Sequence, residues 1–162
     1  MTAKPRHLAS PSRPLTVAAV QMSCGWDADA NIARAEALVR EAAARGARII
    51  LLPELFETPY FCIEQDSRHL ALARPPAHNA AVLHFRSVAR ELGVVLPVSF
   101  FERDGLAYFN SVAIIDADGE VLGVYRKAHI PNGPGYQEKT YFSPGDTGFK
   151  VWSTRHGRIG VG

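Results

Sequence analysis

The sequence predicts an α/β fold with a mixed sheet, and three observations support this prediction. Apolar runs of strand length alternate with stretches of helical period between Leu15 and Phe101. Two later apolar runs flank Asp118-Gly119, a dipeptide that favours a β-hairpin. The 162 residues, of which 47% are hydrophobic, suffice for one domain with a core.

The first predicted unit is a strand, a helix and a second strand. Residues 15–22 form a nearly continuous apolar run, which is typical of a strand covered on both faces. Apolar residues recur at helical spacing over 32–44, and Asp27 or Asp29 is expected to cap this helix. Residues 48–52 follow as a second buried strand. A unit of this length predicts parallel strands with a right-handed crossover.

A second helix and strand follow, and an antiparallel pair of strands is predicted after them. Residues 78–92 have the amphipathic period of a helix, and 94–101 are an apolar strand. The segments 108–116 and 120–125 flank the Asp-Gly turn and are expected to add an antiparallel pair. The sheet is therefore predicted to be mixed.

A loop without any period covers residues 127–148 and holds three prolines, four glycines and three aromatic residues. A loop of this length inside a domain is usually functional, and its aromatic residues favour a packed loop. Residues 149–152 precede a turn, and 158–162 begin what is expected to be another buried strand. We expect residues 1–14 to be a disordered tail and 15–162 to be the domain.

The composition argues against several classes of protein. The net charge is only +2 and the arginines are scattered, so the sequence has no basic patch of the kind that binds nucleic-acid phosphates. No apolar run reaches the length of a signal peptide or a membrane span, so no membrane partner and a cytoplasmic location are expected. Cys24 and Cys62 lie far apart without ligand partners, and the histidines have no metal-binding spacing. We expect neither a metal nor an organic cofactor.

Glu54 and Lys127 each follow directly on an apolar strand. Ligands and catalytic groups gather at the carboxyl ends of strands in α/β sheets, so Glu54 is a candidate general base. A lysine at such a position suits the stabilisation of a developing oxyanion. Each residue could equally be a solvated surface charge, as could Glu138 in the aromatic loop, which is otherwise a second carboxylate that orients the lysine.

Cys62 lies shortly after Glu54 and is a candidate nucleophile if a base lies within reach. Its neighbours Tyr60 and Phe61 instead favour an inert buried thiol. Apart from Cys62, the sequence offers no clear candidate for a nucleophile that would act with Glu54 and Lys127.

Three segments carry a resemblance to a known family. They are Pro53-Glu54-Leu55-Phe56, then Tyr125-Arg126-Lys127-Ala128-His129-Ile130-Pro131, and then Tyr141-Phe142-Ser143-Pro144-Gly145-Asp146. In order and spacing, these segments resemble the carbon-nitrogen hydrolase (nitrilase) superfamily over residues 15–162. Residues 59–62 and 133–139 are most similar to the branch of that superfamily that hydrolyses N-carbamoylputrescine.

The resemblance implies a four-layer α-β-β-α sandwich of which this chain supplies only the first half. It also implies a Glu, Lys, Cys triad, with Glu54 and Lys127 as its first members and Glu138 as the additional glutamate beside the lysine. The family's nucleophilic cysteine is expected about two residues past Gly162, so this chain alone is expected to be inactive. Hydrolysis of N-carbamoylputrescine would give putrescine, ammonia and carbon dioxide.

The remaining expectations concern the substrate and the partners. Tyr60, Asn110 and Tyr136 are predicted to line the pocket for a small carbamoyl amine or amide, although core packing explains such aromatic residues almost as well. Open strand edges and an uncovered sheet face predict a homo-oligomer. The alternatives are another amide or carbamoyl substrate within the same superfamily, and a non-catalytic α/β fragment or interaction module.

Overall fold

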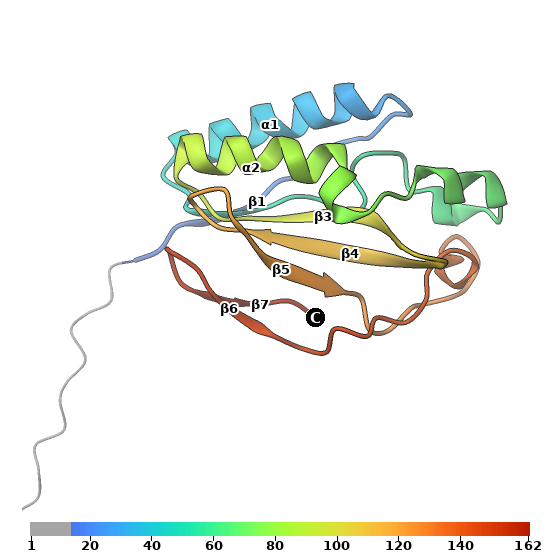
Figure 1. The fold of residues 1–162 in the computed structure, drawn as a ribbon. Helices are drawn as coiled ribbons and strands as arrows, with labels where there is room; N and C mark the ends of the chain where they lie inside the picture. Colours follow the sequence, from blue (N-terminus) through green and yellow to red (C-terminus); the bar gives the residue numbers. More distant parts are fainter. Residues whose placement is uncertain (1–13) are drawn as a thin grey trace, which may run out of the picture.

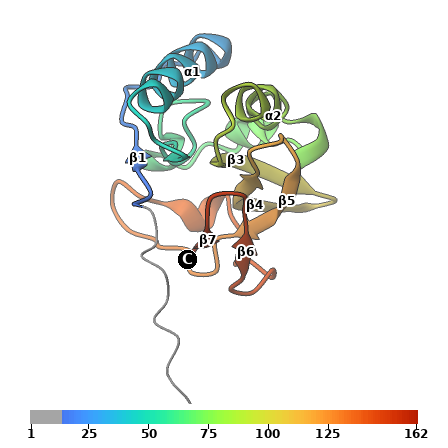
Figure 2. The same cartoon turned by 90° about the vertical axis from the view of Figure 1, so that its left-hand side faces the viewer.

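The computed structural model describes residues 14–162, in which three layers are stacked (Figure 1). Helices α1 (Ala28–Ala44) and α2 (Ala80–Leu92) cover one face of a central layer of strands, and a short hairpin lies against the other face (Figure 2). The predicted tail lies outside the described residues except for Pro14.

The strands are β1 (Val17–Ala19), β2 (Ile49–Leu51), β3 (Leu96–Asp104), β4 (Ala107–Ile115), β5 (Val121–Arg126), β6 (Val151–Ser153) and β7 (Arg158–Gly160). Short 3₁₀ helices are η1 (Phe61–Ile63), η2 (Ser67–Leu72), η3 (Pro76–His78) and η4 (Glu138–Thr140).

Polar side chains cap the start of both helices, and a glycine ends α2. The Asp27 side chain accepts a hydrogen bond from the Ala30 amide at 3.0 Å, so one of the two predicted caps is confirmed. Asn79 caps α2 in the same way through the Val82 amide, at 2.9 Å. Gly93 ends α2 in the left-handed conformation, with φ of 64°. Neither described helix combines the length and the apolar character that crossing a bilayer would require.

The central layer is mixed, as predicted. Strands β1 and β2 pair in parallel, and a parallel bridge between Ile49 and Val95 continues this pairing to the start of β3. Strands β3, β4 and β5 pair antiparallel, with the predicted turn at Asp118-Gly119 between β4 and β5. The nine-residue pairing of β3 with β4 was not predicted, although Asp104-Gly105 at its turn carries the same dipeptide signal.

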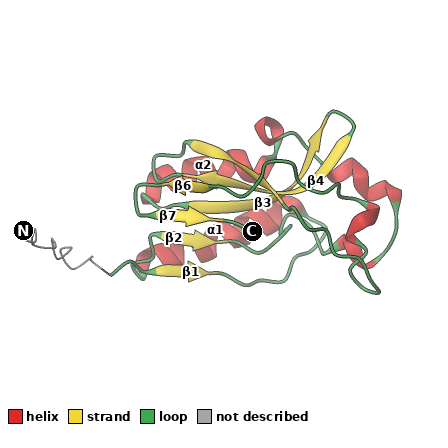
Figure 3. Ribbon diagram, turned by 90° about the horizontal axis from the view of Figure 1, so that it is seen from below, coloured by secondary structure: helices red, strands yellow, loops and turns green. Residues whose placement is uncertain are grey.

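Three predictions of complete burial are wrong. Val17 in β1 and Leu51 in β2 remain 63% and 49% exposed, and in β7 only Ile159 is partly buried. The reason is the position of the β6–β7 hairpin, whose Trp152 packs with Ile114 of β4 and Tyr125 of β5. The hairpin therefore covers the antiparallel part of the layer and leaves the lower face of β1 and β2 open (Figure 3).

The main core lies between the helices and the sheet. Its largest side chains, each fully buried, include Phe56, Phe85 and Phe100. A second cluster packs the long loop against β3, with Phe101 of β3 contacting Phe61 and Phe142. The loop 127–148 is therefore packed, as its aromatic residues predicted.

Candidate active site

The structure brings together Glu54, Lys127 and Glu138, the three residues predicted to be catalytic. The Nζ atom of Lys127 donates to Glu54 Oε1 at 3.1 Å and to Glu138 Oε2 at 2.9 Å. Glu54 follows the end of β2, Lys127 follows the end of β5, and Glu138 begins η4. One ammonium group thus joins three segments that are distant in sequence.

Backbone contacts fix the two residues at the strand ends. Leu55, directly after Glu54, has a left-handed φ of 51° that is rare outside glycine, and its amide donates to Ser99 Oγ at 2.9 Å. The Lys127 amide donates to the Asn110 carbonyl, and the Lys127 carbonyl accepts from the Gly145 amide, both at 2.8 Å. Both strand ends are therefore held by groups on neighbouring segments.

Glu138 is the buried member of the site, at 3% exposure. Its second oxygen, Oε1, accepts a hydrogen bond from the Tyr60 hydroxyl at 2.7 Å. The preceding residue, Gln137, is tied by its amide to the Cys62 carbonyl at 2.6 Å. Both oxygens of this carboxylate thus have donors, as a buried charge requires.

The surroundings adjust the pKa values of three groups. Burial opposes the charge of Lys127, but the hydrogen bond that Lys127 donates to Glu138 and the charge of Glu54 prevail and raise the pKa of the ammonium. Burial, followed by the hydrogen bond to Glu138, raises the pKa of Tyr60, so its hydroxyl stays a donor. Burial, followed by the charges of Glu138 and Glu54, raises the pKa of Cys62 to about 12. The fully buried Cys62 thiol is therefore poorly suited to act as a nucleophile.

Glu54 and Lys127 both line a cavity of about 270 Å³. Asn110 and Ser99 complete its polar part, and the end of the chain at Gly162 also borders it. Its apolar walls are Leu51, Leu52, Val112, Tyr125 and Val161.

The three predicted pocket residues have different surroundings. Asn110 lines the cavity and donates through Nδ2 to Glu54 Oε1. The Tyr60 hydroxyl is directed to Glu138, and Tyr136, which is 47% exposed, packs over Gly133. Tyr60 and Tyr136 are not part of this cavity wall. Substrate contact by any of the three stays a prediction.

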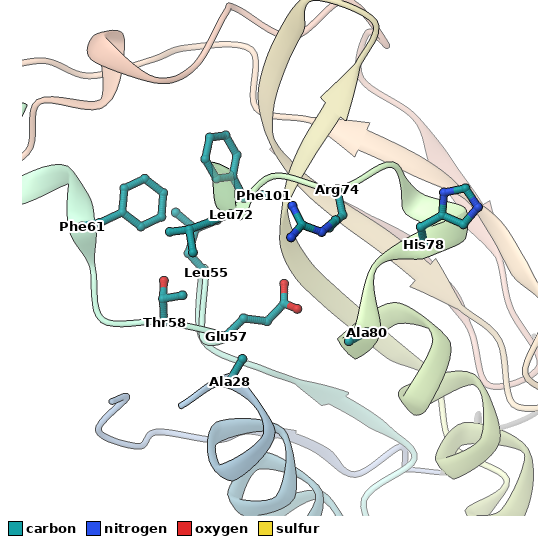
Figure 4. Close-up of a pocket in the computed structure, with 10 residues that line it drawn as sticks. All are labelled: Ala28, Leu55, Glu57, Thr58, Phe61, Leu72, Arg74, His78, Ala80 and Phe101. Atoms are coloured by element: carbon teal, nitrogen blue, oxygen red, sulfur yellow. The ribbon is translucent and has the colours of Figure 1, made fainter. Parts of the chain in front are cut away.

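A second cavity, of about 220 Å³, lies near the start of both helices (Figure 4). It shares no lining residue with the cavity of Glu54 and Lys127. Its acidic residue is Glu57, whose pKa is raised by burial and whose carboxylate accepts from Asn79 Nδ2 at 2.8 Å. This carboxylate supports the N-terminal cap of α2. Among residues 14–162 no cluster of three or more histidine, cysteine or acidic side chains is arranged to hold a metal ion.

Sequence reasoning overlooked two contributions. Ser99 anchors the turn after Glu54, and the signal was present because Ser99 is a lone polar residue within the apolar run 94–101. Arg126, next to Lys127, forms ion pairs with Glu102, Asp104 and Asp146. No local sequence pattern predicts these ion pairs, because the acidic partners of Arg126 come from two other segments of the chain.

Residues 16–162 match the carbon-nitrogen hydrolase family, and this protein chain belongs to that family. The chain is 54% identical over 154 residues to an N-carbamoylputrescine amidase of Solanum tuberosum, which covers 95% of this chain and 51% of the relative. It is 51% identical over 148 residues to a citrullinase of Francisella tularensis, covering 91% of this chain and 52% of the relative.

Solved structures show the same fold. A carbon-nitrogen hydrolase of Helicobacter pylori G27 superimposes with a TM-score of 0.78 at 32% identity, covering 85% of this chain and 48% of that one. A glutamate-to-glutamine mutant of the amidase of Nesterenkonia sp. AN1, which shows the result of Michael addition of acrylamide at its active-site cysteine, has a TM-score of 0.76 at 25% identity, covering 91% of this chain and 56% of that one. The chain therefore spans about half the length of these relatives, and its three layers are part of an α/β sandwich.

Proposed function

We propose that this chain supplies the glutamate and lysine side of the active site of a thiol-dependent hydrolase that cleaves carbon–nitrogen bonds. The observation that carries the proposal is the hydrogen-bonded group of Glu54, Lys127 and Glu138, two of whose members face one cavity. A carboxylate base next to an ammonium group is suited to acyl transfer, because one removes a proton while the other stabilises an oxyanion.

The nucleophile in this proposal is a cysteine in a segment that follows Gly162. Gly162 borders the cavity of Glu54 and Lys127, so a residue shortly after it would start close to both. The active-site cysteine of the Nesterenkonia amidase supports this choice. Glu54 then takes the thiol proton, and the thiolate attacks the carbonyl carbon while Lys127 stabilises the oxyanion.

Collapse of the tetrahedral intermediate breaks the carbon–nitrogen bond. The proton held by Glu54 passes to the departing nitrogen, which leaves as ammonia. A water molecule that gives its proton to Glu54 then attacks the covalent acyl or carbamoyl enzyme and releases the thiol. Glu138, held by Tyr60, keeps the Lys127 ammonium in place throughout.

The proposed substrate is N-carbamoylputrescine, which would give putrescine, carbon dioxide and ammonia, as in polyamine synthesis. The amidase and citrullinase relatives support a substrate with a terminal ureido group, because the substrates in their names share that group. Citrulline is therefore the second candidate. Assembly into a homo-oligomer stays a prediction, and the exposed Val17 and Leu51 are consistent with it.

A chimera provides the direct test. Residues 15–162 of this chain would be joined to the second half of the Solanum tuberosum amidase, and ammonia release would be measured with N-carbamoylputrescine, citrulline and a simple amide. We expect turnover of a ureide, and a loss of roughly 10³-fold or more in both Glu54→Gln and Lys127→Ala. The exposed Glu64 supplies the control Glu64→Gln, which should keep full activity.

The competing hypothesis is a non-catalytic fragment. An inactive chimera that is folded, or one in which Glu54→Gln keeps a normal rate, would contradict the proposed catalytic roles. Reading the coding sequence beyond Gly162 separates the two hypotheses for the natural protein: a cysteine within a few codons supports the enzyme, and a stop codon there supports the fragment.

A further inference from the structure

Asn110 occupies a central position between Glu54 and Lys127. It lies within β4, opposite Phe101 of β3, and is only 4% exposed. Its side-chain Nδ2 donates to Glu54 Oε1, and its backbone carbonyl accepts from the Lys127 amide at 2.8 Å. A single residue of a paired strand thus contacts both groups that face the cavity.

The two oxygens of Glu54 are not equivalent. Asn110 Nδ2 and Lys127 Nζ both donate to Oε1, and within residues 14–162 these are the side-chain hydrogen bonds that the carboxylate receives. The Glu54 side chain is 50% exposed. A half-exposed glutamate would exchange rotamers freely without such an anchor. Two donors on one oxygen fix the carboxylate and leave Oε2 without a donor from this part of the chain.

We propose that Asn110 is a positioning residue that holds Glu54 by Oε1 and so reserves Oε2 for the proton of the nucleophile. The catalytic consequence rests on the proposed function, whereas the hydrogen bond itself does not. The role differs from the substrate contact predicted from the sequence, because this amide is engaged by the base. A base whose proton-accepting atom points in a fixed direction needs no reorientation during the reaction.

Nuclear magnetic resonance of the 162-residue chain tests the hydrogen bond without any activity. We expect a scalar coupling across the hydrogen bond between the Asn110 side-chain nitrogen and the Glu54 carboxylate carbon, and slow exchange of the Asn110 side-chain protons. The exposed Asn132 is the internal reference for fast exchange. Glu54→Ala should abolish the coupling, and Glu138→Gln should retain it. Asn110 protons that exchange as fast as those of Asn132, with no coupling, would overturn the proposal.

Kinetics of the chimera test the role of the contact. Asn110→Leu keeps the approximate shape of the side chain but removes the hydrogen-bond donor. Because a hydrogen bond to a charged group is lost, we expect kcat to fall roughly 10- to 100-fold, and we expect KM to stay within about twofold of its original value. Asn110→Gln, which keeps the donor, should recover part of the loss. Tyr108→Phe, on the same strand, is the matched control and should change neither constant.

The outcomes separate the possible errors. A raised KM with unchanged kcat in Asn110→Leu would show a substrate contact and overturn the positioning role. Failure of Asn110→Gln to exceed Asn110→Leu would indicate a purely structural effect and would also overturn it. A folded chimera that is inactive with Asn110 intact refutes the proposed function instead, and the resonance experiment then still decides whether Asn110 holds Glu54.

Discussion

Replacing Arg126 by leucine should destabilise the fold strongly, because it isolates a buried charge. The guanidinium donates through Nε and a terminal nitrogen to both oxygens of Glu102, at 3.0 and 2.6 Å. The Arg126 and Glu102 side chains are 13% and 3% exposed. Without Arg126, the Ser111 hydroxyl is the remaining described side-chain donor to the Glu102 carboxylate.

The magnitude follows from this burial. Removal of one partner from a buried ion pair costs about 3–5 kcal/mol, whereas the pairs with Asp104 and Asp146, each 65% exposed, add at most about 1 kcal/mol. The guanidinium also lies 4.0 Å from the centre of the Phe109 ring, a contact that the variant loses. We therefore expect Arg126→Leu to lower the free energy of unfolding by about 4 kcal/mol.

Urea unfolding followed by circular dichroism measures this loss. With a slope of about 2 kcal/mol per M, the midpoint should fall by roughly 2 M. The exposed Arg103 gives the matched control Arg103→Leu, which should change stability by less than about 0.5 kcal/mol. The double variant Arg126→Leu/Glu102→Leu removes the isolated charge and should be more stable than Arg126→Leu. A loss below about 1 kcal/mol in Arg126→Leu, or no recovery in the double variant, would refute this reasoning.

Three further predictions concern stability and pH. The contacts with Arg40 and His84 lower the pKa of Glu36. The ionised carboxylate therefore stabilises the fold above about pH 4.3, and this stabilisation is lost as the pH falls through the lowered pKa. Glu36→Gln should be less stable than the unchanged chain at pH 7, and urea titrations should show this difference vanish in acid. Burial raises the pKa of Glu57, so its ionised form destabilises the fold. Glu57→Gln should therefore be more stable than the unchanged chain at pH 7 but not at pH 3. A loss of stability at pH 7 would contradict the upward direction of this pKa shift. A Cβ at Gly145 would lie 2.0 Å from the Arg126 carbonyl oxygen. Gly145→Ala should therefore lower the free energy of unfolding by about 1–3 kcal/mol and lower the thermal midpoint, whereas Gly25→Ala, in open space, should change neither.

The sequence predicted those features that depend on neighbouring residues. Helical spacing, the Asp27 cap and the Asp118-Gly119 turn act within a few positions, so the order of elements and the mixed sheet followed from them. Glu54 and Lys127 were identifiable because each follows an apolar strand, and strand ends converge at one edge of a sheet.

The features that were missed or wrong depend on packing between distant segments. The exposure of Val17 and Leu51 is decided by where the β6–β7 hairpin lies, and no pattern within β1 or β2 encodes that position. Besides Lys127, the side-chain donors to Glu54 and Glu138 are Asn110 and Tyr60, 56 and 78 positions away along the chain. A polar residue inside an apolar strand signals that a partner exists, but identifying the partner requires the tertiary structure.

Under the proposed function, the different surroundings of the two carboxylates suit them to different roles around one ammonium group. Glu138 is buried and both of its oxygens already have donors, so it can act only as a fixed counter-charge that keeps Lys127 protonated. Glu54 is half exposed, faces the cavity and has donors on one oxygen only, so it retains an oxygen that can accept a proton. The division of labour therefore follows from burial and hydrogen bonding, since both side chains have the same chemistry. Exchanging these surroundings, rather than the residues, would exchange their proposed functions.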